Sequence, residues 1–133
     1  MNKLLIHVNE EMPDERVEEL KLLVRENLKI DCEVKKDYVT KGIEETIATI
    51  ILSLIIKDVY DYLKPKFAKF LKNIFNRFTP AKVIIKDNQS KSIYIIPSSI
   101  EESELEKALE KIPSPKKKGY FFYDINRKEW KND

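Results

Sequence analysis

Apolar and polar residues alternate over residues 3–8 and again in the first part of residues 30–39, which predicts two half-buried strands. Between these runs, apolar residues recur at three- and four-residue spacing over residues 17–28, as on one face of an amphipathic helix. Pro13 suits the first position of this helix, because proline lacks an amide hydrogen that would have no partner there. The three elements together predict a right-handed β-α-β unit with parallel strands.

The next segment, residues 46–56, contains no charged residue, although 36% of the chain is charged. A helix that spans a bilayer needs roughly 20 apolar residues in a row, so we predict no transmembrane segment. Charged residues flank the run on both sides. We therefore predict that it forms the middle of a buried core helix over residues 43–63.

Pro65 follows this segment and is expected to disturb the helix, because proline lacks an amide hydrogen and crowds the carbonyl four residues earlier. Either one long helix is kinked at Pro65, or a second helix begins after it and covers residues 66–78. The polar face of this second piece is rich in lysine. Its apolar face consists of Phe67, Phe70, Leu71, Ile74, Phe75 and Phe78.

The last third of the chain predicts a hairpin, a helix and a second hairpin. Residues 81–86 and 92–96 are β-branched runs joined by residues that favour turns. Ser98, Ser99 and Ser103 each precede a glutamate by three residues, which is typical of a capping box at a helix start. The aromatic residues 120–123 predict a strand that returns through Trp130, with aromatic side chains paired across the hairpin.

We therefore predict one α+β domain over residues 1–133. Its element order is β-α-β-α-β-β-α-β(-β), in which the second α is the kinked helix or the two consecutive helices. The sheet is expected to be mixed, with about five or six strands, and to pack against the helices.

The chain has one cysteine, Cys32, so it can form neither an internal disulfide nor a zinc site with several cysteine ligands. This composition suits a reducing compartment. The first residues do not form the apolar region of a signal peptide, because Asn9 and two glutamates follow a short apolar stretch. We therefore predict a cytoplasmic protein.

Candidate catalytic residues are few. His7 is the only histidine and lies on the polar side of its strand, so we predict a structural or surface role. Cys32 lies in an apolar row, where desolvation raises the pKa of a thiol and makes it a poor nucleophile. With only two glycines, Gly42 and Gly119, the chain cannot build a glycine-rich phosphate loop. We predict no enzyme activity, no cofactor and no metal site.

Charge is unevenly distributed between the two halves of the chain. Residues 1–62 hold 9 Lys/Arg and 14 Asp/Glu, a net charge of −5, whereas residues 63–133 hold 16 and 9, a net charge of +7. This pattern fits either a solvated helix face or a surface for nucleic acid or anionic lipid. The candidate surface residues are Lys64, Lys66, Lys69, Lys72, Arg77, Lys116, Lys117 and Lys118.

Residues 30–112 also resemble a known family, the effector-associated constant component domains of bacterial conflict and signalling systems. The features that carry the resemblance are Gly42 before the long apolar segment, the helix end near Tyr62 and Leu63, the hairpin over residues 83–96, and the helix over residues 105–112. The resemblance implies a non-catalytic adaptor that couples an effector to a partner protein.

The function predicted from these observations is that of a small protein–protein interaction or adaptor domain, with polyanion binding as the alternative. Two surfaces are candidates: an open edge of the sheet, and apolar residues of the helix over residues 65–78 that the core does not absorb. Because residues 43–78 hold more large apolar side chains than one face of a small sheet can bury, we also predict a homodimer.

Overall fold

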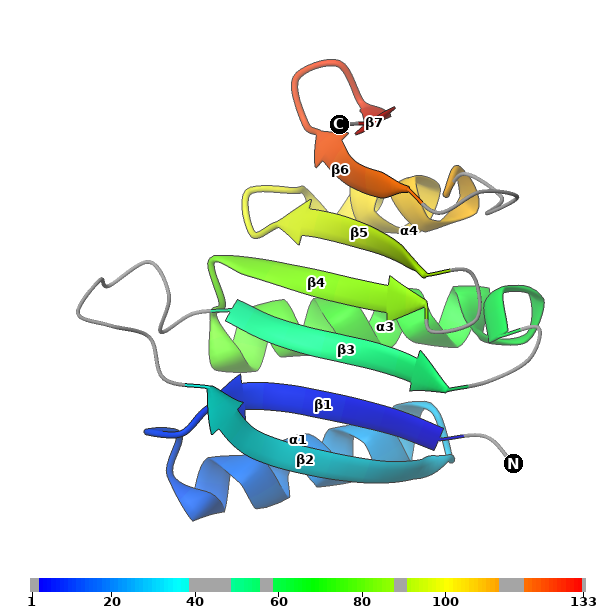
Figure 1. Ribbon diagram of the computed structural model, residues 1–133. Helices are drawn as coiled ribbons and strands as arrows, with labels where there is room; N and C mark the ends of the chain where they lie inside the picture. Colours follow the sequence, from blue (N-terminus) through cyan, green and yellow to red (C-terminus); the bar gives the residue numbers. More distant parts are fainter. Residues whose placement is uncertain (1–2, 39–48, 56–58, 88–90, 113–118, 133) are drawn as a thin grey trace.

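The computed structural model describes residues 3–38, 49–55, 59–87, 91–112 and 119–132. Within these residues the chain forms one mixed sheet of seven strands and three helices (Figure 1). The strands are β1 Lys3–Asn9, β2 Asp31–Tyr38, β3 Thr49–Ile55, β4 Lys82–Asp87, β5 Ser92–Pro97, β6 Tyr120–Asp124 and β7 Glu129–Asn132. The helices are α1 Asp14–Asn27, α3 Val59–Phe78 and α4 Glu102–Glu110. The predicted α+β class with a mixed sheet is confirmed, but the sheet is larger than the five or six strands expected.

The order of strands across the sheet is β2-β1-β3-β4-β5-β6-β7. Neighbouring strands alternate between parallel and antiparallel pairing, beginning with the parallel pair β1–β2. Each parallel pair is joined by a helix, so the chain consists of three consecutive β-α-β units followed by β7. The parallel pairing predicted for the first unit is confirmed.

All three helices lie on the same face of the sheet (Figure 1). The units β3-α3-β4 and β5-α4-β6 step in the same direction across the sheet, yet β5 runs antiparallel to β4. The hand of a crossover depends on the strand direction, on the direction of the step across the sheet and on the face that the helix covers. These two crossovers share the face and the step direction but differ in strand direction, so they have opposite hands. The first of them is right-handed, so β5-α4-β6 is left-handed, an exception to a rule that about 98% of such connections obey.

The charge-free run does not form the predicted core helix. Within it, Thr49–Ile55 is strand β3, hydrogen-bonded between β1 and β4. The run is rich in isoleucine and threonine, whose β-branched side chains favour strands, and its length suits one strand better than a long helix. An all-apolar run is typical of an interior strand as well as of a buried helix.

Helix α3 passes through Pro65 without a break in its assignment, so the proline does not separate two helices. The amphipathic face predicted for its second half is confirmed. Phe67, Phe70, Leu71 and Ile74 are buried against the sheet, and Phe75 and Phe78 pack partly buried at the edge of the same core. The apolar side chains described on this helix are therefore absorbed by the core, contrary to the interaction surface predicted from them.

The core lies between the helices and one face of the sheet. The residues that the strands contribute are Leu4, Ile6 and Val8 of β1, Ile50 and Leu52 of β3, Val83 and Ile85 of β4, and Tyr94 and Ile96 of β5. Helix α1 adds Leu20, Leu23 and Val24, and helix α4 adds Leu105 and Leu109. None of the described helices is both long and apolar enough to cross a membrane.

Both predicted hairpins are present. Strands β4 and β5 pair antiparallel, and so do β6 and β7. As predicted, aromatic side chains pair across the second hairpin, where the rings of Tyr123 and Trp130 lie 5.3 Å apart. Trp130 Nε1 also donates a hydrogen bond of 2.8 Å to the Ala108 carbonyl oxygen, which ties the hairpin to α4. The predicted capping box does not form, because the N-cap of α4 is Glu101 and no side chain caps it.

The strand assignment of β3 predicts an alternating sensitivity to truncation. Leu52 is fully buried beneath the helices, so Leu52→Ala is expected to lower the free energy of unfolding by about 2–5 kcal/mol. Ile51 is half-buried on the other face, so Ile51→Ala is expected to cost about 1 kcal/mol. Urea denaturation of both variants measures the difference, and equal losses at the two positions would contradict the assignment.

Candidate functional site

The face of the sheet that carries no described helix is unusually apolar. Alternation along each strand places every second side chain on this side, and the strand register brings those side chains into rows. One row contains Ile51, Ile84, Ile95 and Phe122, which are direct partners across β3, β4, β5 and β6. The neighbouring row contains Leu5, Ser53, Lys86, Ile93 and Tyr120. We call the apolar members of these two rows the open face: Leu5, Ile51, Ile84, Ile93, Ile95, Tyr120 and Phe122.

Exposure on the open face is highest on β6. Tyr120 is 44% exposed and Phe122 38% exposed, and the isoleucines of the open face are half-buried. A sheet with one face packed on helices normally carries polar residues on the other face. A contiguous apolar patch rimmed by polar residues is instead typical of an interaction site.

Charged side chains surround the open face in nearly equal numbers of each sign. Lys3 pairs with Glu33 at 2.9 Å near one edge of the sheet, and Lys131 pairs with Asp124 at 3.2 Å near the other. The described cations on this side are Lys3, Lys35, Lys82, Lys86 and Lys131, and the described anions are Asp31, Glu33, Asp124 and Glu129. The rim is therefore close to electrically neutral.

The two edges of the sheet are less suited to binding another strand. Edge strand β2 carries charged residues at Asp31, Glu33, Lys35 and Lys36, and edge strand β7 has only four residues. Charged side chains and short length are the usual features by which proteins protect edge strands from pairing. Of the candidate surfaces formed by the sheet, its open face is the stronger.

The structure does not gather the predicted basic residues into one surface. Lys66, Lys69, Lys72 and Arg77 are exposed on the outer side of α3. Lys64 also lies within α3, whereas Lys116, Lys117 and Lys118 lie outside the described residues. By the alternation of β4, Lys82 and Lys86 lie on the opposite side of the molecule, on the face of the sheet that carries no described helix.

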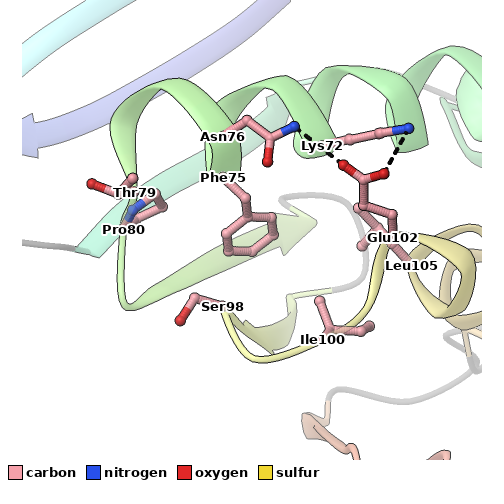
Figure 2. Close-up of a pocket in the computed structure, with 9 residues that line it drawn as sticks. All are labelled: Lys72, Phe75, Asn76, Thr79, Pro80, Ser98, Ile100, Glu102 and Leu105. Carbon is pink, nitrogen blue, oxygen red and sulfur yellow. Dashed lines mark hydrogen bonds and ion pairs between the residues drawn. The ribbon is translucent and has the colours of Figure 1, made fainter.

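A pocket of about 260 Å³ lies between the end of α3, the start of β4 and the start of α4 (Figure 2). Its charged group is Glu102, whose two carboxylate oxygens accept from Lys72 Nζ at 3.0 Å and Asn76 Nδ2 at 3.2 Å. Hydrogen bonds from these two side chains hold the pKa of Glu102 below its ordinary value. The carboxylate is thus already paired and is a poor candidate for a general base.

A second pocket of about 240 Å³ adjoins Tyr123 and Lys128. Tyr123 donates a hydrogen bond of 2.9 Å to Glu104. Burial and this hydrogen bond raise the pKa of Tyr123 to about 12, so the phenol stays protonated at neutral pH. The contact fixes α4 against the C-terminal hairpin, which is a structural role.

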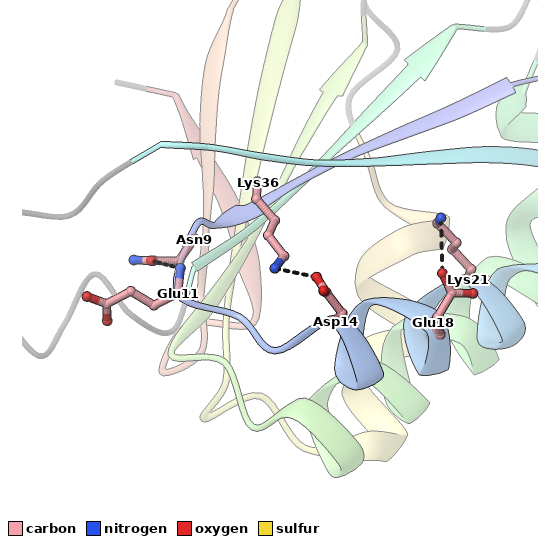
Figure 3. A network of polar contacts seen from close by, with 6 residues as sticks. All are labelled: Asn9, Glu11, Asp14, Glu18, Lys21 and Lys36. Carbon is pink, nitrogen blue, oxygen red and sulfur yellow. Dashed lines mark hydrogen bonds and ion pairs between the residues drawn. The ribbon is translucent and has the colours of Figure 1, made fainter.

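A polar network links β1, β2 and the start of α1 (Figure 3). Lys36 Nζ lies 2.6 Å from Asp14 Oδ1, and the Glu11 amide donates to Asn9 Oδ1 at 2.9 Å. The hydrogen bond from Lys36 holds the pKa of Asp14 below its ordinary value. These contacts position the first turn of the helix. Among the described residues, no group of histidine, cysteine and carboxylate side chains could hold a metal ion.

The two predicted candidates for catalysis lie on opposite faces of the sheet. His7 is on the side that carries no described helix, in register with Lys35 and Ile51. Cys32 faces α1 and packs against the core, as predicted. Burial raises the pKa of its thiol to about 11. The two side chains are therefore not brought together.

The open face is indicated in the sequence by strand segments that are apolar at every position, and not by alternation. Residues 83–85 of β4 and 93–96 of β5 are apolar at every position, so both sides of these strands are apolar. In a strand covered on one side only, such a run places apolar residues in solvent. The hairpin itself is confirmed, and its two strands carry apolar side chains on both sides.

Comparisons with known proteins found no match: no protein-family model matches the chain, and no curated protein or solved structure does so.

The environment of Cys32 predicts slow alkylation. With a pKa of about 11 in the folded state and 9.0 as the reference value, the thiolate fraction at pH 8 is about 100-fold smaller in the folded protein. Iodoacetamide is therefore expected to modify the native protein about 100-fold more slowly than the protein unfolded in urea. Mass spectrometry of timed samples measures both rates, and equal rates would show that the thiol is not desolvated.

Proposed function

We propose that this chain is a non-catalytic protein–protein interaction module whose contact surface is the open face. The single observation that carries the proposal is the apolar row of Ile51, Ile84, Ile95 and Phe122, which crosses four adjacent strands. Exposed apolar surface of this continuity is unfavourable in water, and a partner that covers it gains about 25 cal/mol per Å² of apolar area buried.

The composition of the open face supports this role. Aromatic residues are enriched at the centres of protein interfaces and often dominate the binding energy. Tyr120 and Phe122 are the most exposed members of the open face, and both lie on β6. Strand β6 is held by pairing on both sides and by the contacts of Tyr123 and Trp130 with α4. The two aromatic side chains therefore project from a well-supported strand, which limits the entropy lost on binding.

An adaptor role follows from the resemblance to effector-associated constant component domains. The hairpin of β4 and β5 and the helix α4 correspond to two of the features on which that resemblance rests. Gly42 lies outside the described residues, and the segment after it contains β3 in place of a long apolar helix. On this proposal the chain couples an effector to a partner protein in a bacterial conflict or signalling system.

Polyanion binding is the alternative. Lys66, Lys69 and Lys72 form an exposed row along α3, at a spacing that places them on one side of a helix. Glu102 already pairs with Lys72, which reduces the positive potential at the end of the row. The short length of this row and the separation of Lys82 and Lys86 from it make the alternative weaker.

Variants of the open face test the proposed function. Phe122→Lys places a charge in the apolar patch, so it is expected to abolish retention of a protein partner from a lysate of the source cells, washed at high salt. Leu22 is 50% exposed on α1, away from the sheet, and Leu22→Lys serves as the matched control. The control is expected to retain the same partner as the wild-type chain.

Circular dichroism must first show that both variants are folded. A partner that binds wild type, Phe122→Lys and Leu22→Lys equally would show that the open face is not the contact surface.

The alternative has its own test. If α3 binds polyanions, the double variant Lys66→Glu, Lys69→Glu weakens binding of a single-stranded oligonucleotide or of anionic vesicles. The slope of log affinity against log salt then decreases by about 2, roughly one for each lysine lost. Lys82→Glu, on the other side of the molecule, is the control. Fluorescence anisotropy over a salt series measures the slopes, and a double variant that binds as the wild type does would exclude this alternative.

A further inference from the structure

We propose that the occupant of the open face is a second copy of this chain, so that two sheets pack face to face in a symmetric dimer. The inference rests on the proposed function and names its partner. The core already absorbs the described apolar side chains of α3, so the apolar surplus lies on the sheet. The sequence also predicts a homodimer, but on the basis of the apolar side chains of residues 43–78. The contact surface proposed here is the open face instead.

The area of the uncovered face of the sheet suits a dimer. Seven strands of four to eight residues, with a rise of ~3.3 Å per residue and a spacing of ~4.8 Å, present a planar face of about 700 Å². A stable interface of standard size buries about 800 Å² on each partner. The whole face of the sheet is thus close to the size that a specific dimer needs. No described helix obstructs this face, because α1, α3 and α4 all lie behind the sheet (Figure 1).

The charge on this face of the sheet is also compatible with a dimer. A surface that meets its own copy must not bear a large excess of one sign, since like charges then oppose each other across the interface. The described charged residues on this face of the sheet include five lysines and four carboxylates. This near balance permits self-association, whereas the lysine row on the outer side of α3 would repel its copy.

An axis that crosses the strands suits the rows of the open face better than an axis along β4. A two-fold axis along β4 would place Lys86 directly against the Lys86 of the partner subunit. An axis that crosses the strands between the row of Ile84 and the row of Lys86 avoids this clash. This axis places each row of one copy over the other row of the partner copy. A residue then faces the partner's residue that lies two positions away on the same strand.

This second axis matches like with like in polarity on β2, β5 and β6. On β3, Ile51 faces the partner's Ser53, and on β1, His7 faces the partner's Leu5. Ile95 faces the partner's Ile93, and Phe122 faces the partner's Tyr120, so the aromatic residues of the two copies pack together. On β2, Lys35 faces the partner's Glu33, and the symmetry repeats this contact. At Ile84 the neighbour is the stem of the partner's Lys86, whose methylene groups can lie along apolar surface while the ammonium reaches solvent.

The dimer is tested by the mass of the wild-type protein in solution. Light scattering at about 100 μM chain is expected to give twice the 15.8 kDa of one chain. Ile95→Lys and Phe122→Lys are each expected to return the mass to that of one chain, and Leu22→Lys is expected to leave it doubled. A wild-type mass of one chain, or a doubled mass in every variant, would overturn the inference.

A cross-link tests the face-to-face packing of the two sheets without a destabilising charge. In a Cys32→Ala background, Ile84→Cys is expected to give a covalent dimer with a short bismaleimide. A disulfide is not expected, because packed sheets lie about 10 Å apart, beyond the reach of two cysteines. Leu22→Cys in the same background is the control and is expected to stay monomeric on the denaturing gel. Cross-linking of the control alone would contradict the sheet-to-sheet arrangement.

Failure of the dimer and failure of the proposed function give different results. A monomeric wild type that still binds another protein through Phe122 overturns the dimer and leaves the interaction module intact. A wild type that is monomeric and whose partner binding ignores Phe122 overturns both.

Discussion

Burial of one face of the sheet beneath α1, α3 and α4 is the interaction on which the rest of the structure depends. The apolar side chains of β1, β3, β4 and β5 on that face form one continuous surface with the helices. Helix α3 lies across the middle of it, where Phe70, Leu71 and Ile74 are fully buried. The described helices cover this face only. The opposite face therefore presents the alternate side chains of each strand without a helix over them.

The position of α4 determines how much of the opposite face stays bare. A right-handed connection between β5 and β6 would have placed α4 on the other side of the sheet, over Ile93, Ile95 and Phe122. Contacts on the α3 side hold the helix in the rarer arrangement: Glu102 binds Lys72, Tyr123 binds Glu104, and Trp130 binds the Ala108 carbonyl. Burial of Leu105 and Leu109 in the common core favours the same position. The position of α4 on the same side of the sheet as α3 thus accounts both for the left-handed crossover and for the exposed apolar row.

Several carboxylates in the described part of the chain bind other side chains of the same chain. The carboxylate of Glu102 pairs with α3, that of Glu104 accepts from a tyrosine, and that of Asp14 pairs with Lys36. Cys32 is a partly buried, protonated thiol against α1. By contrast, the open face offers isoleucine and aromatic surface with a balanced rim. The open face is accordingly the surface on which the proposed protein interaction rests.

Local sequence determined much of the fold. Alternation gave β1 and β2, three- and four-residue spacing gave α1 and the buried face of α3, and turn residues gave the hairpin of β4 and β5, because these patterns report on each residue's immediate neighbours. Sequence did not determine whether the charge-free run was helix or strand, since apolar side chains on both sides of β3 remove the alternation that distinguishes them. The hand of the β5-α4-β6 crossover and the row from Ile51 to Phe122 depend on strand order and on the face each helix occupies. Only tertiary structure decides these features, because they join residues that are distant along the chain.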